Sequence, residues 1–330
     1  MRAAGAEDGR AGGFHDGEIA VQRAAGVRAE AQRLVGMLDP ADFTGGVGSS
    51  LAQRTFAVLT ARDARGVLWA SPLTGPPGFL HVTDASTLQV QTAPRARDPL
   101  AELPTGQQVG LIAVDFATRR RYRLNGRLTA ADGTALTVNV EQAYGNCPQY
   151  IQQRTLSAGE ASLAGVLPGG AGPLGASDRL DPADLKQVHS ADTFFLGTTH
   201  ASRGSDASHR GGSTGFVRVA DDRTLWWPDY PGNNLFNSHG NLALDPTAAL
   251  LFLDFSTGRT LHLTGRANLQ VTRAGTDGDD GKTGRRVRFH VGATTHGPAL
   301  PLRADAVTAS PRNPPLRGTG TCHHQNDDVG

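Results

Sequence analysis

Cysteine is nearly absent from the sequence. The 330 residues include two, Cys147 and Cys322, too few for the disulfide framework of a small secreted domain. No stretch approaches the roughly 18 consecutive apolar residues of a membrane-spanning helix. Residues 1–13 carry scattered charges and lack the apolar run of a secretory signal. We therefore expect a cytoplasmic protein with no membrane partner.

An excess of either charge is also missing. Thirty-two basic side chains balance 31 acidic ones, for a formal net charge of +1. Proteins that bind nucleic acid broadly present a basic surface, which this balance does not favour. The short basic run Arg119–Arg121 is interpreted as a solvated strand end. We expect no nucleic-acid partner.

The common catalytic and metal-binding motifs do not occur. The eleven histidines include no HExxH pair, and the chain has no GxSxG, no P-loop and no GxGxxG after a strand. Cys322-His323-His324 resembles a metal-binding tract, but two or three ligands on a chain end make a poor site. Cys147 could be a redox thiol or part of a plain turn. We expect no metal site and assign no catalytic residue.

What the sequence does have is an internal repeat. Residues 69–90 align without gaps with residues 206–227, and residues 111–127 align with residues 250–266. The two offsets, 137 and 139, are nearly equal, and Phe56 and Thr60 recur at an offset of 138. Blocks that keep their order and spacing indicate a duplicated unit. We predict two barrels, about 45–157 and 187–295, that superpose on one another.

Short strand-like runs make up most of each copy. They are rich in β-branched, leucine and aromatic residues, and Gly, Pro and Asp separate them. The runs are 56–60, 67–70, 79–82, 88–91, 109–116, 121–125, 136–140 and 287–291. Helices are expected at 16–38, 147–156, 182–188 (with Asp181 as N-cap) and 235–244. The pattern predicts a mainly β protein with flanking helices.

Copy two carries more polar detail than copy one. Its segment 206–212, read as a turn, holds Ser, His, Arg and Gly, which can present N–H groups and a cation to an anion or a planar polar ring. An ordinary solvated hairpin is the alternative. The segment 230–241 places Asn and Ser at a presumed helix start, where phosphate can bind. Simple helix capping by Asn is the alternative there.

These segments together resemble a known family. Ser-His-Arg-Gly-Gly at 208–212, Tyr-Pro-Gly-Asn-Asn at 230–234, Gly-Asn-Leu at 240–242 and Leu-Leu-Phe-Leu-Asp-Phe at 250–255 resemble the pyridoxamine 5'-phosphate oxidase-like, FMN-binding split-barrel family. The resemblance implies tandem six-stranded split barrels with FMN, which family members often bind at a dimer interface. The tandem would then form an internal pseudo-dimer, or the chain a homodimer.

The resemblance also suggests which residues bind the cofactor. The flavin ring would lie against 207–212 and the phosphate against 230–241. The candidates are Ser208, His209, Arg210, Gly211, Gly212, Asn233, Asn234, Asn237, Ser238 and Asn241. Many family members carry Arg or Lys at the phosphate, where this chain has Asn and Ser. Arg210, His239, Arg259 or Arg266 would have to supply the charge, so we expect weak FMN binding that depends on Arg210 and not on Arg121.

The expected function is that of an FMN-binding oxidoreductase with a small-molecule redox substrate or electron donor. The alternative is a non-catalytic module that holds flavin, deazaflavin or haem, or a degenerate scaffold. The expected organisation is a disordered N-terminus (1–13), an N-terminal helix with the first barrel (14–157), a Gly/Pro-rich linker (158–180), the second barrel (181–310) and a disordered tail (311–330).

Overall fold

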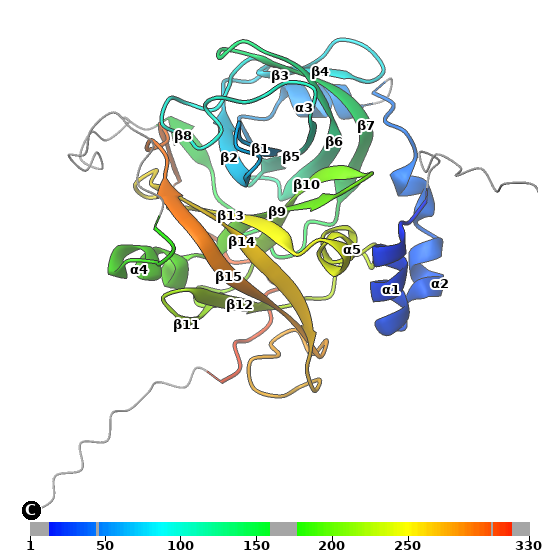
Figure 1. Ribbon diagram of the computed structural model, residues 1–330, viewed down its shortest axis with the longest axis vertical. Helices are drawn as coiled ribbons and strands as arrows, with labels where there is room; N and C mark the ends of the chain where they lie inside the picture. The colour runs from blue at the N-terminus through cyan, green and yellow to red at the C-terminus, as the bar shows by residue number, and fades with distance from the viewer. Residues whose placement is uncertain (1–12, 44–45, 159–176, 305, 319–330) are drawn as a thin grey trace, which may run out of the picture.

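The computed structural model describes residues 13–43, 46–158, 177–304 and 306–318 (Figure 1). Within them lie two seven-stranded antiparallel sheets and one two-stranded sheet. The segment 159–176, most of the expected linker, and Cys322–His324 lie outside the described residues.

Each sheet is built from one copy of the repeat. The strands of the first are β1 (Phe56–Arg62), β2 (Leu68–Thr74), β3 (Leu80–Val82), β4 (Thr87–Val90), β5 (Gln108–Asp115), β6 (Arg120–Ala131) and β7 (Leu136–Asn146). Those of the second are β9 (Thr193–His200), β10 (Gly204–Gly211), β11 (Arg218–Asp221), β12 (Thr224–Pro228), β13 (Thr247–Leu253), β14 (Thr260–Val271) and β15 (Arg285–His296). The small third sheet pairs β8 (Leu156–Ala158) with β16 (Leu302–Ala304).

The two large sheets have the same topology, which confirms the tandem fold. Their strand orders are β2-β1-β5-β6-β7-β4-β3 and β10-β9-β13-β14-β15-β12-β11. Even a local irregularity recurs, because the register shifts at Gly126 in one sheet and at Gly265 in the other. A Cβ at either glycine would lie 2.1 or 2.0 Å from a carbonyl oxygen of the neighbouring strand. Glycine is therefore required at this bulge in both copies.

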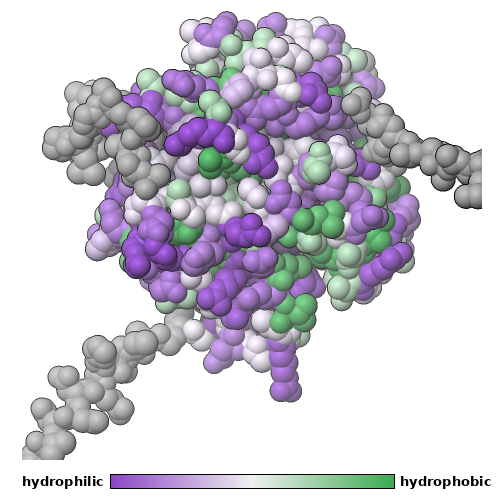
Figure 2. Space-filling view, viewed as in Figure 1, coloured by the Kyte–Doolittle hydropathy of each residue, from purple (hydrophilic) through white to green (hydrophobic). Residues whose placement is uncertain are grey.

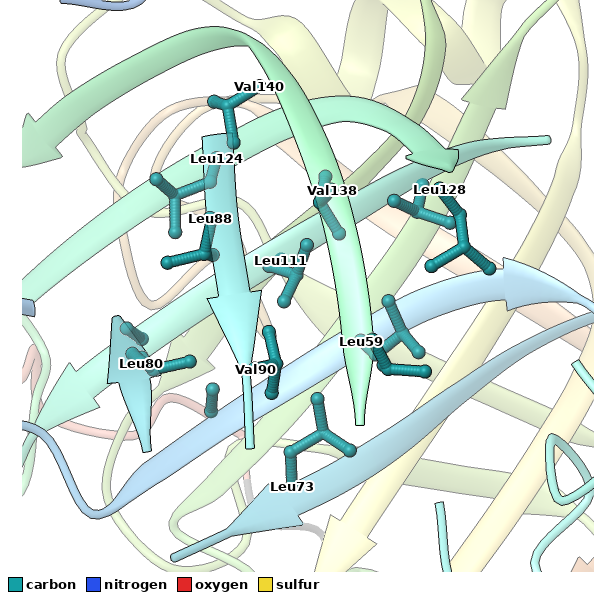
Figure 3. Packing of buried hydrophobic residues seen from close by; sticks show 14 of the residues in the cluster. Leu59, Leu73, Leu80, Leu88, Val90, Leu111, Leu124, Leu128, Val138 and Val140 are labelled. Atoms are coloured by element: carbon teal, nitrogen blue, oxygen red, sulfur yellow. The ribbon is translucent and has the colours of Figure 1, made fainter. Parts of the chain in front are cut away.

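Each sheet curls around its own apolar core. In the first, leucines and valines from all seven strands point to a common centre (Figure 3). In the second, aromatic rings take that place. The ring centroids of Phe216, Phe252 and Trp227 lie 4.9 to 5.8 Å from that of Phe194. Alternation of buried and exposed residues along β7 and β15 matches the half-buried strands expected from the sequence.

A third core joins the two barrels. It contains Phe56 and Ile112 of the first copy and Phe195 and Leu251 of the second, all at most 1% exposed. The contacts are reciprocal: β10 packs on β5 and β6, and β2 packs on β13 and β14. The chain is thus an internal pseudo-dimer, with an apolar interface between its halves.

The helices differ in part from the expected ones. α4 (Pro182–Ser190) begins at Asp181, whose side chain accepts from the Asp184 N–H, as the sequence predicts. The single helix expected at 16–38 is instead α1 (Asp16–Ala24), α2 (Arg28–Gln32) and a short 3-10 turn, η1 (Val35–Leu38). Gly26 interrupts it with a φ of +70°. α3 (Val47–Ala52) precedes β1.

The prediction of a helix at 147–156 was wrong. No helix forms there, because Tyr150 has a φ of +64° and the chain then leads into β8. The fourth helix, α5 (Asn237–Leu244), starts two residues later than expected. Phe236 precedes it in the left-handed region and gives no side-chain cap.

Residues 311–318, which we placed with the tail, lie against the second barrel. The side chain of Leu316 packs on its core, and the Arg317 N–H donates to Asp280 at 2.7 Å. No helix among the described residues is long and apolar enough to cross a membrane. The face in Figure 2 is largely polar, with apolar side chains gathered where α1, α2 and α5 lie.

Candidate functional site

A cavity of about 130 Å³ lies where the two barrels meet; we call it the interbarrel cavity. The first barrel contributes β6 and the segment that follows β7. The second contributes β10, the end of β12, the start of α5, the segment between β12 and α5, and β15. Both copies are therefore needed to form it.

The structure brings most of the predicted site residues to this cavity. Those lining it are Ser208, His209, Arg210, Gly211, Asn233, Asn234, Asn237 and Ser238. The segments 207–212 and 230–241 thus face one common space and not two separate ones. The first is not a turn as we expected, because Gly204–Gly211 is the strand β10.

Two predicted residues lie elsewhere. Gly212 follows β10 beside Phe216, and its N–H donates to the Asp192 carbonyl. Asn241 is one turn further along α5, where its side chain donates to Thr198 Oγ1 at 3.0 Å and contacts His15 Nε2 at 3.1 Å. Neither lines the interbarrel cavity.

Sequence reasoning found Arg210 but missed the other three arginines of the cavity. Arg121 and Arg123 reach it from β6 of the first barrel, and Arg285 from β15. The signal that could have revealed them is the repeat itself. If the copies form a pseudo-dimer, β6 of one copy meets β10 of the other. Arg121 is half-buried beside His209, so it is part of the site and not the solvated strand end we expected.

Two of the four cavity arginines have carboxylate partners. Arg123 Nε lies 3.2 Å from Asp206 Oδ1, and Arg285 Nε lies 2.8 Å from Asp229 Oδ2. Among the described residues, Arg121 and Arg210 pair with no carboxylate. The cavity wall therefore carries about two positive charges in excess, which an anionic ligand would neutralise.

The residues that line the cavity also carry buried hydrogen-bond donors with no acceptor. Within the described part of the chain, seven buried nitrogen atoms of cavity-lining residues lack a hydrogen-bond partner. Two of them, Arg123 Nε and His239 Nε2, lie 3.2 and 3.7 Å from a carboxylate oxygen. The other five are Arg121 Nε, Asn146 Nδ2, His209 Nε2, Arg210 Nε and Trp227 Nε1. His209 Nε2 belongs with the donors, because Nδ1 faces the Arg121 guanidinium at 3.0 Å and must accept there. Buried donors without acceptors are costly, so this cavity suits a ligand rich in oxygen acceptors.

Burial and mutual repulsion shift the pKa values of the cationic side chains. Burial, helped by the charges of Arg123 and Arg210, lowers the pKa of Arg121 to about 9. Burial lowers the pKa of His209 well below its usual value, and the neighbouring arginines add to this effect. Any anion bound here would oppose these shifts.

His239 does not supply the cation we considered. Burial lowers its pKa to about 4, and the raising effect of Asp229 at 3.7 Å does not overcome that. Arg259 pairs with Asp184 at 2.8 Å, and Arg266 is exposed on β14; neither lines the cavity. Of the four groups named from the sequence as possible cations, His239 and Arg210 line the cavity, and Arg210 alone is charged there; β6 and β15 provide the other cations.

A buried hydrogen-bond network supports the cavity wall. Ser238 Oγ lies 3.0 Å from Asp206 Oδ2 and 3.1 Å from Ser208 Oγ. Asn237 Oδ1 accepts from Tyr144 Oη at 3.0 Å and from Arg123 Nη1 at 3.3 Å. The network links β10 and α5 of the second barrel to β6 and β7 of the first, so it fixes the wall across the barrel interface.

Two segments close the cavity from opposite barrels. The Tyr150 hydroxyl donates to the Pro231 carbonyl at 2.9 Å, and Asn233 Nδ2 donates to Asn146 Oδ1 at 3.1 Å. Tyr150, Asn234 and Phe236 all have φ between +60° and +64°. Such left-handed backbone is uncommon in residues other than glycine and often marks functional sites. The exposed Cys147 lies in the same wall.

The equivalent position in the other half of the pseudo-dimer does not carry the same donors. Pro72 and Leu73 occupy the repeat positions of His209 and Arg210. The fully buried His262 takes the place of Arg123, with Nδ1 2.9 Å from the Ala70 carbonyl oxygen and Nε2 3.0 Å from Thr260 Oγ1. The two halves of the duplicated fold thus differ in the donors at this position.

No protein-family model and no curated protein matches the sequence. Solved structures do match. HupZ of Group A Streptococcus is 14% identical, with a TM-score of 0.30, over 37% of this chain and 99% of that chain. A putative pyridoxamine 5'-phosphate oxidase from Lactobacillus delbrueckii is 12% identical (TM-score 0.29, 36% and 95%), and the FAD binding protein from Mycobacterium smegmatis is 13% identical (TM-score 0.24, 36% and 97%). By its repeated strand order the chain is a tandem of two split barrels, similar to proteins of the pyridoxamine 5'-phosphate oxidase-like kind.

Proposed function

We propose that the chain binds a flavin nucleotide of the FMN type through its phosphate group in the interbarrel cavity. The observation that carries this proposal is the set of five unpartnered buried donors around two guanidiniums that lack a carboxylate. A phosphate monoester carries close to two negative charges and three strong acceptor oxygens. It matches both the excess charge and the donors.

The size of the cavity supports the phosphate end of the ligand in particular. Sites for cofactor-sized molecules commonly enclose about 300–1,000 Å³, whereas a cavity of about 150 Å³ holds a single benzene ring. A volume of 130 Å³ is room for a phosphate and the atoms next to it. The rest of the flavin would extend beyond the enclosed space.

The proposed redox role follows from the cofactor and not from an acid–base constellation. A bound flavin supplies hydride or electron transfer, and the protein positions it and tunes its electronics. Here Arg121 and Arg210 would hold the phosphate from opposite barrels. Ser208 and Ser238, tied to Asp206, would keep the wall between them in place. We propose an oxidoreductase of this kind, and the substrate or electron donor is left open.

The test compares three arginine variants by their flavin content. Arg121→Gln and Arg210→Gln each remove one unpaired charge from the cavity, and Arg266→Gln makes the same change on the exposed face of β14. We expect about tenfold or greater loss of FMN affinity in the first two, as for one charge-assisted hydrogen bond, and no change in the third. Equal FMN affinity in all three variants would refute the site.

A further inference from the structure

Glu18 lies behind the interbarrel cavity and is almost completely buried. It belongs to α1, which precedes the first barrel in sequence but packs on α5 of the second (Figure 1). The two helices touch closely: a Cβ on Gly17 would lie 2.1 Å from the Gly240 carbonyl oxygen. Glu18 is 3% exposed, so its carboxyl group is held inside the protein.

One side chain separates Glu18 from the ligand cavity. Asn237 Nδ2 donates to Glu18 Oε1, and Asn237 Oδ1 accepts from Arg123 Nη1 on the cavity side. A second cavity of about 20 Å³, room for one water, lies beside Glu18, and Asn237 lines both cavities. The Asn237 side chain thus lies between a charge placed in the interbarrel cavity and the Glu18 carboxyl group.

The groups around Glu18 come from every element packed near it. His15 donates its backbone N–H to Glu18 Oε2 at 2.9 Å, and its ring nitrogen Nε2 lies 3.7 Å from the same oxygen. The charged and titratable groups whose fields reach the carboxyl are His15 at the start of α1, Arg123 of β6, Tyr144 of β7, Arg203 between β9 and β10, and Asp206 of β10. Arg28 of α2 turns instead to Gln22.

The geometry points to Glu18 as a proton acceptor coupled to the ligand site: we propose that Glu18 takes up a proton when a dianion occupies the interbarrel cavity. This inference rests on the proposed function. The negative charge of the bound anion is balanced by Arg123 and its neighbouring cations. Their stabilising effect on the Glu18 carboxylate is therefore reduced. The proton comes from solvent by way of the small cavity, and no covalent bond changes.

In the free protein, the protonated and ionised forms of Glu18 are already close to equally populated at neutral pH. Burial raises the pKa of Glu18 to about 7, against the lowering effects of its hydrogen bonds with His15 and Asn237. A nearby dianion raises it further, because like charges disfavour the ionised carboxyl. For a further rise of one unit in the pKa of Glu18, about half a proton is taken up per ligand at pH 7.5, and affinity falls by about sixfold between pH 6.5 and 8.5.

Proton uptake is measured by titration calorimetry of the full-length protein in two buffers of different ionisation enthalpy, with FMN and with sulfate as probes. Sulfate keeps its charge over this pH range, so any proton taken up when sulfate binds is taken up by the protein. Wild-type protein should take up about half a proton at pH 7.5. Glu18→Gln should take up much less and bind with weaker pH dependence. Glu30→Gln, the same change on an exposed residue of α2, should behave as wild type.

A second measurement needs no variant that could fail to fold. The chain has six glutamates, so carboxyl ¹³C NMR of glutamate-labelled wild-type protein can follow one buried titration with and without sulfate. An upward shift of that pKa on sulfate addition is expected. If FMN binds and wild type and Glu18→Gln take up equal numbers of protons, the coupling is refuted while the ligand site stands. If neither probe binds wild-type protein, both proposals fall.

Discussion

His239 shows how burial controls charge at single residues of the site. It is 4% exposed, and its pKa of about 4 leaves it neutral at pH 7. Its wall position therefore gives the ligand a neutral ring beside the cationic Arg210 and Arg285. The positive charge of the site belongs to guanidiniums, which stay charged where an imidazole does not.

The same lowered pKa makes stability depend on pH. The unfolded chain binds a proton at His239 below about pH 6.5, whereas the folded protein does not until about pH 4, so stability falls as the pH falls through this window. At pH 5 the cost is roughly 2 kcal/mol. Thermal unfolding at pH 7 and pH 5 should show a smaller loss for His239→Gln than for wild type. Equal losses would mean that His239 is protonated when folded.

Gly211 is constrained by the other barrel. A Cβ at this position would lie 2.0 Å from the Tyr150 carbonyl oxygen. We expect Gly211→Ala to displace the segment around Tyr150, destabilise the fold by about 1–3 kcal/mol as overpacking does and weaken FMN binding. Gly232→Ala is the control, because it also lines the cavity and a Cβ there meets nothing within 4 Å. The two variants should differ in denaturant unfolding; matching curves would contradict the close approach.

At the scale of elements, α1 acts as part of the second barrel although it precedes the first. His15 caps it, Glu18 bonds with Asn237, and Gln22 Nε2 donates to the Leu235 carbonyl at 3.0 Å. The contacts of Glu18 and Gln22 meet the start of α5 and the residues just before it. α1 therefore supports the cavity wall on both sides of Phe236, whose backbone is in the left-handed region.

Gly17→Ala tests this role of α1. The added methyl group would meet the Gly240 carbonyl, so α1 must move away from α5. We expect FMN affinity to fall several-fold, since the contacts of Glu18 with Asn237 are disturbed. Gly46→Ala, where a Cβ meets nothing within 4 Å, should leave FMN binding unchanged. The measurement is titration of both variants with FMN. An FMN affinity of Gly17→Ala equal to that of wild type would exclude a supporting role for α1.

The sequence predicted the strands well because local signals define them. Each of the seven strand-like runs of copy one falls on a strand of the structure, and Asp181-Pro182 begins a helix as predicted. The segment 147–156 lacked such a local signal. Its path is set by long-range contacts, among them the Tyr150 hydroxyl with Pro231, 81 residues away. Arg121 was missed for the same reason, because its neighbour His209 is 88 residues distant in sequence.

At the scale of the whole molecule, the shared interface core makes the two barrels one unit. Phe195 is 1% exposed, with its ring centroid 5.6 Å from that of Phe56 of the other copy. We expect Phe195→Ala to cost about 3–5 kcal/mol and to lower the one unfolding transition of the whole chain. Val271→Ala, at an 82% exposed position, should have little effect. Scanning calorimetry that resolved two transitions, with one of them unmoved by Phe195→Ala, would show that the barrels unfold independently.

We propose one phosphate-binding cavity per chain, formed between the two barrels. The direct measurement is calorimetric titration of the apoprotein with FMN and with riboflavin, which lacks the phosphate. We predict one FMN site per chain, with FMN bound at least about tenfold more tightly than riboflavin. Equal affinities, or two FMN sites per chain, would contradict the claim and favour a non-catalytic binding module or scaffold.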